Sequence, residues 1–233
     1  MKTIKILIAL VLFAAGQTFA ANVEDRHLSG FHAVDAAGSF DVYITQGNAE
    51  SVKVDAPGDV IGNVITEVKN GTLRIHSKDK FNWKDLFKNK KVSVYVTVKN
   101  IDDINLSGSG NVRFQDGLKA ANGDIHLHIS GSGNMEGKLT ARSVDAGISG
   151  SGNLKLAGST EDQNVSVSGS GNYSARDFTS SKANVSVSGS GNASVYCNNT
   201  LNAHVSGSGN VHYNGNPKNV SKSKSGSGSV SGS

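Results

Sequence analysis

The residues of this chain that could do metal or acid–base chemistry recur at one position relative to a repeated motif. The pentapeptide Ser-Gly-Ser-Gly-Asn occurs six times, and four residues before three successive copies stand Asp103, His126 and Asp145. His128 follows two residues after His126, so both side chains leave the same face of a strand. If the copies stack in register, the imidazole and carboxylate groups of these residues lie close enough to bind zinc or a similar metal ion. The alternative is an exposed ladder of ion pairs, each contributing under about 1 kcal/mol.

A second candidate site is the segment from Lys78 to Lys91, which holds the single tryptophan of the chain. Six lysines and two aspartates give this segment a local charge of +4. Trp83 and Phe87 are four residues apart, a spacing that one face of a short helix would bring together. The segment is then either a helical cap over the open end of a stack of strands or a contact surface for an anionic glycan, a membrane or a partner protein. In the second case, the ligand-binding residues would be Phe81, Trp83, Lys84, Phe87 and Lys88.

The motif itself predicts the architecture that positions these residues. Its copies begin at Ser107, Ser130, Ser149, Ser168, Ser188 and Ser206, and a degraded seventh begins at Ser225. Successive copies are 23, 19, 19, 20, 18 and 19 residues apart, a period typical of one turn of a stacked coil. In the degraded copy, Lys222 and Lys224 replace the apolar residues, so we expect this segment to fray or to cap the stack.

The flanks of the motif alternate between apolar and polar residues, as a strand with one buried face does. The residues directly before the motif are Leu106, Ile129, Ile148, Val167, Val187 and Val205. Two short strands per repeat exclude a helical solenoid and predict a β-solenoid of about 19-residue coils. Glycine suits the corner because it accepts positive φ, and the asparagines should stack there as a ladder. Calcium binding of the nonapeptide type is not expected, because the motifs contain no carboxylate.

Residues 21–105 lack the motif but continue the strand pattern. Alternating or β-branched runs at 39–46, 51–54, 72–76 and 91–98 predict strands, and Asn70-Gly71 predicts a tight turn. We expect these residues to form irregular N-terminal coils, with 78–91 as an insertion, that run into the same stack as residues 106–233. The prediction is a single domain over residues 21–233.

The first twenty residues read as a cleaved secretory signal, because two lysines precede an apolar run over residues 6–15 and Thr18-Phe19-Ala20 follows it. No other segment is apolar enough to predict a transmembrane helix. Removing the signal lowers the net charge from +4 to +2, too little to indicate nucleic-acid binding. The lone Cys197 is expected to be a small core residue.

Four segments, in this order, resemble the head GIN domain family. They are Gly38-Ser-Phe-Asp-Val-Tyr-Ile-Thr-Gln-Gly47, Asn70-Gly-Thr-Leu-Arg-Ile75, Val94-Tyr-Val-Thr-Val98 and Leu106-Ser-Gly-Ser-Gly-Asn111. The family comprises exported bacterial proteins of unknown function that are described as putative autotransporter adhesins. The resemblance implies a right-handed parallel β-helix and export in a Gram-negative bacterium, to the periplasm or the cell surface. It supplies no catalytic residues.

We therefore expect a non-enzymatic structural or binding module of the cell envelope, adhesin-like and without a cofactor. Its expected partner is an envelope glycan or a surface protein. The alternative is a carbohydrate-active or metal-dependent β-helix enzyme that uses the face of His126 and Asp145. Glycoside hydrolysis requires two carboxylates across a cleft, whereas ladders rich in Ser, Asn and Gly form a flat wall.

Overall fold

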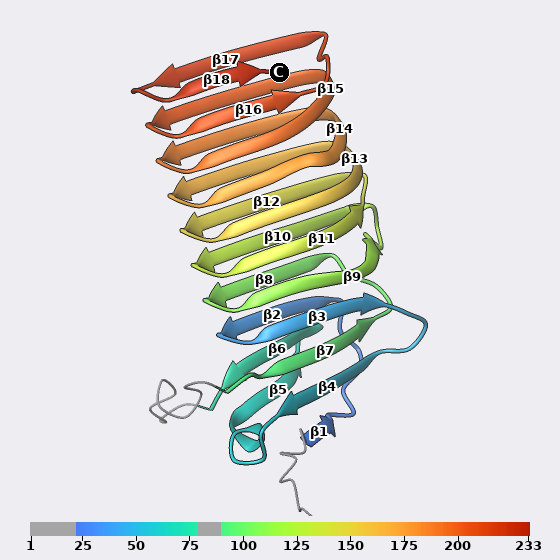
Figure 1. The fold of residues 1–233 in the computed structure, drawn as a ribbon. Helices are drawn as coiled ribbons and strands as arrows, with labels where there is room; N and C mark the ends of the chain where they lie inside the picture. The colour runs from blue at the N-terminus through green and yellow to red at the C-terminus, as the bar shows by residue number, and fades with distance from the viewer. Residues whose placement is uncertain (1–21, 79–89) are drawn as a thin grey trace, which may run out of the picture.

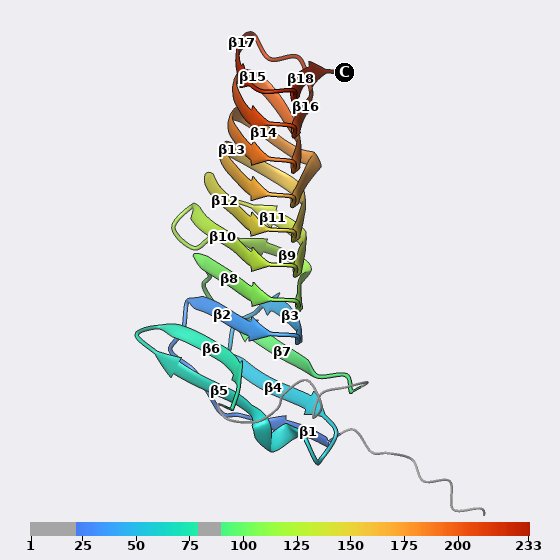
Figure 2. The ribbon, with the colours of Figure 1, turned by 90° about the vertical axis from the view of Figure 1, so that its left-hand side faces the viewer.

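The computed structural model describes residues 22–78 and 90–233, which form a β-solenoid (Figure 1). Its coils number about seven, with about 19 residues in each, as the spacing of the motif predicts. Each coil adds one strand to each of two sheets that face one another across the core (Figure 2). A short 3₁₀ turn, η1, spans Ile61–Asn63.

The strands of the N-terminal part are short. They are β1 (Asn22–Asp25), β2 (Ala33–Gly38), β3 (Asp41–Gln46), β4 (Ser51–Ala56), β5 (Val64–Lys69), β6 (Thr72–Ser77) and β7 (Ser93–Val98). The strands of the repeats follow as β8 (Asp103–Gly108), β9 (Asn111–Lys119), β10 (Asp124–Gly131), β11 (Asn134–Thr140), β12 (Ser143–Gly150), β13 (Asn153–Gly169), β14 (Asn172–Gly189), β15 (Asn192–Gly207), β16 (Asn210–Asn214), β17 (Asn219–Ser225) and β18 (Ser229–Gly232). The predicted turn at Asn70-Gly71 is confirmed, since both residues have positive φ and join the antiparallel strands β5 and β6.

The long strands β13, β14 and β15 bend from one sheet to the other. The first part of β13 pairs with β11, and its second part pairs with β12. The first sheet consists of β8, β10, β12, the second parts of the three long strands, and β17. Among the repeat strands, the second sheet consists of β9, β11, the first parts of the long strands, β16 and β18. Strands β3 and β7 extend this sheet beyond β9.

The N-terminal strands join this stack out of sequence order. Strands β2 and β3 lie between the β6–β7 pair and the β8–β9 coil, with parallel pairing on both sides. Antiparallel strands β5, β4 and β1 complete the lower end of the stack (Figure 1). The N-terminal part thus continues the stack as expected, but its coils are not consecutive in the chain.

Alternation along the strands places the core. The six residues that directly precede the motif copies, from Leu106 to Val205, are at most 2% exposed. Cys197 is also buried, and its thiol donates to the carbonyl oxygens of Ser181 and Thr200. Because each inward residue packs against its counterparts in adjacent coils, the core is continuous along the axis.

The two glycines of each motif are required for different reasons. The first glycine has a φ between +109° and +120° in all six copies, which favours a residue without Cβ. The second glycine lacks that conformation but has no room for a side chain. At Gly171, an added Cβ would lie 2.6 Å from the carbonyl oxygen of Gly152 and 2.5 Å from Cγ2 of Ile148. The corner therefore requires close contact between the backbones of successive coils.

The motif asparagines form a hydrogen-bonded ladder along one corner of the solenoid. In five consecutive steps from Asn134 to Asn210, each Nδ2 donates to Oδ1 of the asparagine one coil earlier, over 2.8–3.1 Å. Asn111 continues the ladder by donating to Asp41 over 2.7 Å. The prediction that these residues stack is confirmed, and their side chains bond to one another.

Among the described residues, the repeats bury three polar side chains, those of Thr160, Gln163 and Ser180. Gln163 is fully buried, and its Nε2 donates to Oγ of Ser180 over 2.6 Å and to the carbonyl oxygen of Tyr196 over 3.2 Å. The hydroxyl of the buried Tyr173 donates to Oε1 of Gln163 over 3.2 Å. The pairing of β14 with β15 shifts register beside these residues, between Ala175 and Thr179. Gln163 and Ser180 thus both donate to the carbonyl oxygen of Tyr196, which faces the interior at this irregular coil.

The last coil differs from the others in its inward residues. Lys222 pairs with Ala203 and Lys224 pairs with Val205, so both lysines stand at positions that are apolar in the preceding coil. All residues of β17 are exposed, and Nζ of Lys222 lies 4.9 Å from the centre of the Tyr213 ring. The segment pairs as strands at the end of the stack, which agrees with the predicted cap.

Candidate binding groove on the first sheet

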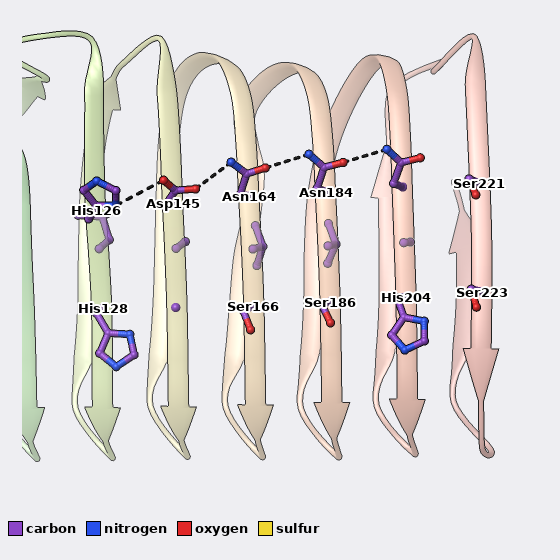
Figure 3. A pocket seen from close by; sticks show the side chains of 17 residues that line it. His126, His128, Asp145, Asn164, Ser166, Asn184, Ser186, His204, Ser221 and Ser223 are labelled. Carbon is purple, nitrogen blue, oxygen red and sulfur yellow. Dashed lines mark hydrogen bonds and ion pairs between the residues drawn. The ribbon is translucent and has the colours of Figure 1, made fainter.

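An open groove of about 670 Å³ runs across the outer face of the first sheet, from β10 to β17 (Figure 3). Two rows of outward side chains line it, and we call it the polar groove. Apolar residues that stand between the two rows also line it, namely Leu127, Ala146, Val165, Val185 and Ala203. The first row consists of His126, Asp145, Asn164, Asn184, Asn202 and Ser221. The second row, two residues further along each strand, consists of His128, Gly147, Ser166, Ser186, His204 and Ser223. Parallel pairing in constant register places each member beside its counterpart in the next strand, about 4.8 Å away.

The first row is a second amide ladder. Nδ2 of Asn202 donates to Oδ1 of Asn184 and Nδ2 of Asn184 to Oδ1 of Asn164, both over 2.9 Å. Nδ2 of Asn164 in turn donates to Oδ1 of Asp145 over 2.8 Å. The ladder has one direction, and it ends on a carboxylate that accepts (Figure 3).

The structure brings three of the four predicted chemical residues together. His126 pairs with Asp103 on one side and with Asp145 on the other. Its Nδ1 lies 3.4 Å from Oδ2 of Asp145, and Asp103 accepts a hydrogen bond of 2.8 Å from Nδ2 of Asn105. Burial raises the pKa of Asp103, an effect that the charge of His126 opposes. Within the described ranges, no group of three or more His, Cys, Asp or Glu side chains is arranged to hold a metal ion.

The fourth predicted residue, His128, belongs to the second row of the groove. A Cβ added to Gly147 would lie 2.5 Å from Nδ1 of His128, so the imidazole occupies the space that a side chain at Gly147 would fill. Ser166 and Ser186 follow Gly147 along the row, and His204 stands beyond them (Figure 3). Two imidazoles therefore flank a floor of small residues, an arrangement that is visible in the sequence only once the register is known.

The second sheet carries a feature that the sequence reasoning missed. The rings of Tyr43 and Tyr95 stack with centroids 5.1 Å apart and planes 15° apart. The guanidinium of Arg113 lies 5.9 Å from the Tyr43 ring centre and donates to Glu136 over 2.7 Å. The side-chain hydrogen bond to Glu136 raises the pKa of Arg113. These residues come from strands β7, β3, β9 and β11, and the non-sequential order of the coils places Tyr43 between Tyr95 and Arg113.

The other predicted ligand-binding residues, Phe81, Trp83, Lys84, Phe87 and Lys88, lie outside the described residues. The secretory signal proposed for residues 1–20 lies outside them as well. In the part of the chain that the structure describes, no helix has the length and apolar character needed to cross a membrane.

Solved structures of proteins from Bacteroides fragilis and two Parabacteroides species have the same fold. A "putative adhesin" from Bacteroides fragilis superposes with a TM-score of 0.81 at 23% identity, over 91% of this chain and 97% of that one. A "putative lipid binding protein" from Parabacteroides distasonis gives a TM-score of 0.71 at 24% identity, over 91% and 96% of the two chains. A "putative adhesin" from Parabacteroides merdae gives 0.71 at 20% identity, over the same shares of the two chains. These likenesses confirm the fold.

No curated protein matches the chain. The family model described as "Putative auto-transporter adhesin, head GIN domain" matches residues 30–217, which include the polar groove up to His204 and nearly all of the core. The resemblance carried by the four sequence segments is thus confirmed, and the chain belongs to the head GIN domain family of adhesin-like proteins.

Proposed function

We propose that this protein is an exported, non-enzymatic binding module of the cell envelope and that the polar groove is its binding surface. The groove itself carries the proposal, because it combines a concave surface of about 670 Å³ with two ordered rows of hydrogen-bonding groups. Its walls belong to a continuous stack of paired strands, so the rows are held in place before any ligand arrives. Preorganisation of this kind lowers the entropic cost of binding. Membership in an adhesin-like family agrees with this role.

The geometry around His126 argues against glycoside hydrolysis at this face. Asp103 and Asp145 lie on the two strands that flank β10, about 10 Å apart by strand spacing. Such a pair would need the space between its carboxyl groups for the glycosidic bond and a water molecule. The strand of His126 lies in that interval, and its imidazole is 3.4 Å from Asp145. The arrangement is an ion-pair ladder at the end of a binding groove.

The proposal is tested by filling the groove without touching the core. Ser166 on β13 and Ser186 on β14 point outward into the groove. Ser174 on β14 and Ser194 on β15 point outward from the second sheet, away from the groove. The double variant Ser166→Gln with Ser186→Gln should lose retention on isolated cell envelopes. The matched variant Ser174→Gln with Ser194→Gln should be retained like the parent, and both should melt normally.

A reducing-sugar assay on the same envelopes separates binding from turnover. The parent should release no sugar above a heat-denatured control. Release that disappears in the groove variant would show that the enzymatic alternative is correct. Equal retention of both double variants would show that the polar groove is not the binding surface.

A further inference from the structure

The lining of the polar groove selects an uncharged ligand. Among its lining residues, Asp145 alone carries a carboxylate, and both oxygens of Asp145 already have partners in Asn164 and His126. Lysine and arginine are absent from that lining. An acidic or basic polymer would therefore lose its hydration without gaining an opposite charge. Beyond Asp145, the rows contain asparagine, serine and histidine side chains, which donate and accept hydrogen bonds.

The amide ladder repeats these hydrogen-bonding groups along the solenoid axis. Each asparagine amide has two N–H donors and an oxygen with two lone pairs. The ladder uses one donor and one lone pair at Asn164 and Asn184, so one of each is left for a ligand. Amide groups recur on the three successive strands β13, β14 and β15, about 4.8 Å apart, and the serine hydroxyls stand in a parallel row about 6.6 Å away along the strands. A chain of hydroxyl-bearing rings presents donors and acceptors with a comparable repeat.

The two imidazoles set the length of the site. His128 and His204 are separated by four strand spacings, which amounts to about 19 Å. Between them the row contains Gly147, Ser166 and Ser186, so the floor is low between two raised ends. Imidazole rings can pack on the apolar face of a sugar while their nitrogens contact its hydroxyls.

From these features we infer that the polar groove binds an uncharged, linear polysaccharide that runs along the solenoid axis, across the strands. One sugar ring lies over each strand, so about four rings extend from His128 to His204. The amide ladder contacts one edge of the chain and the serine row contacts the other. This inference rests on the proposed function, because it specifies the ligand of the same groove.

The test is a length series of neutral oligosaccharides. Cello-, chito- and manno-oligosaccharides from dimer to hexamer are titrated into the full chain by calorimetry. For at least one series, affinity should rise more than about tenfold from dimer to tetramer and less than about threefold from tetramer to hexamer, because further rings pass the end of the site. Oligogalacturonate of equal length, which is acidic, should bind more weakly.

Histidine variants check which side chains set the length. His128→Ala and His204→Ala should each weaken binding of the tetramer by about tenfold, as expected for the loss of one packed, hydrogen-bonding ring. His212→Ala is the matched control, because His212 points outward from β16 on the second sheet. It should leave the affinity unchanged.

The outcomes distinguish this inference from the function on which it rests. Equal affinity for dimer and tetramer, or tighter binding of the acidic series, would overturn the neutral four-ring site. If no neutral series binds while the groove variant still loses envelope retention, the binding function stands and the polysaccharide assignment is wrong. If envelope retention is also insensitive to the groove variant, both fail.

Discussion

The second glycine of the motif offers a stringent test of how the coils pack. In Gly171→Ala, the new Cβ would lie 2.6 Å from the carbonyl oxygen of Gly152, which accepts the backbone N–H of Asn172 over 3.0 Å. It would also lie 2.5 Å from Cγ2 of Ile148, a buried side chain. Both neighbours are held in place, so one coil must move away from the next. A weakened hydrogen bond adds to the cost of overpacking.

Overpacking costs about 1–3 kcal/mol and a weakened backbone hydrogen bond about 0.5–1.5 kcal/mol, so we expect a loss of about 2–4 kcal/mol. For a chain of this size, that loss lowers the melting temperature by roughly 5–15 °C. Thermal unfolding followed by circular dichroism measures it. Gly62→Ala is the control, because a Cβ added to Gly62 meets nothing within 4 Å and should leave the melting temperature unchanged. If Gly171→Ala melts within about 2 °C of this control, the close backbone contact between coils is incorrect.

Three further predictions concern the core, the half-buried carboxyl of Asp103 and the aromatic segment. Val167→Asp should lower the free energy of unfolding by several kcal/mol, because Val167 is 1% exposed, whereas the exposed Ser166→Asp should be nearly neutral. Equal decreases in the melting temperature of the two variants would contradict the register. Burial raises the pKa of Asp103 above its ordinary 3.8, so its contribution to stability is complete at acidic pH and is lost as pH rises through the folded pKa. The melting temperature of Asp103→Asn relative to that of the parent should therefore increase as pH rises from about 3 to 6. A difference in melting temperature that does not change with pH would refute this. If residues 78–91 form a contact site, the double variant Trp83→Ala with Phe87→Ala should abolish envelope retention, and its melting temperature should stay within a few degrees of that of the parent. A far lower melting temperature would identify the segment as a cap.

The repeats could be predicted from sequence because two simple constraints determine them. Period-2 alternation assigns Val167 to the interior and Ser166 to the surface, and the fixed distance from the motif places His126 beside Asp145. Parallel pairing then preserves that position from coil to coil. The register of the groove follows directly, although its concave shape depends on small residues such as Gly147 that have no motif of their own.

The features that escaped prediction depend on contacts between distant segments. Tyr43 and Tyr95 stack because β3 pairs with β7 although 52 positions separate the two rings in the chain, and no repeat marks that pairing. Alternation puts Gln163 on the inward face, in one row with Val144 and Ala183, but nothing in its own segment marks the inward carbonyl group of Tyr196 to which it donates. Local pattern cannot reveal either contact, because both depend on how coils of unequal length meet.

The lysines of the last coil have a consequence for self-association. The outer edge of β17 presents backbone groups to which the strand of another molecule could add, as happens when fibrils grow. Any strand laid against β17 in the existing register would enclose the ammonium groups of Lys222 and Lys224 between two coils. Burying an ammonium without a carboxylate partner costs several kcal/mol, which offsets much of the gain of about 0.5–1.5 kcal/mol from each new backbone hydrogen bond. The serine- and glycine-rich coils are similar enough that the end coil of one molecule could pair with that of another. The two lysines that end the apolar row therefore favour separate molecules over end-to-end polymers.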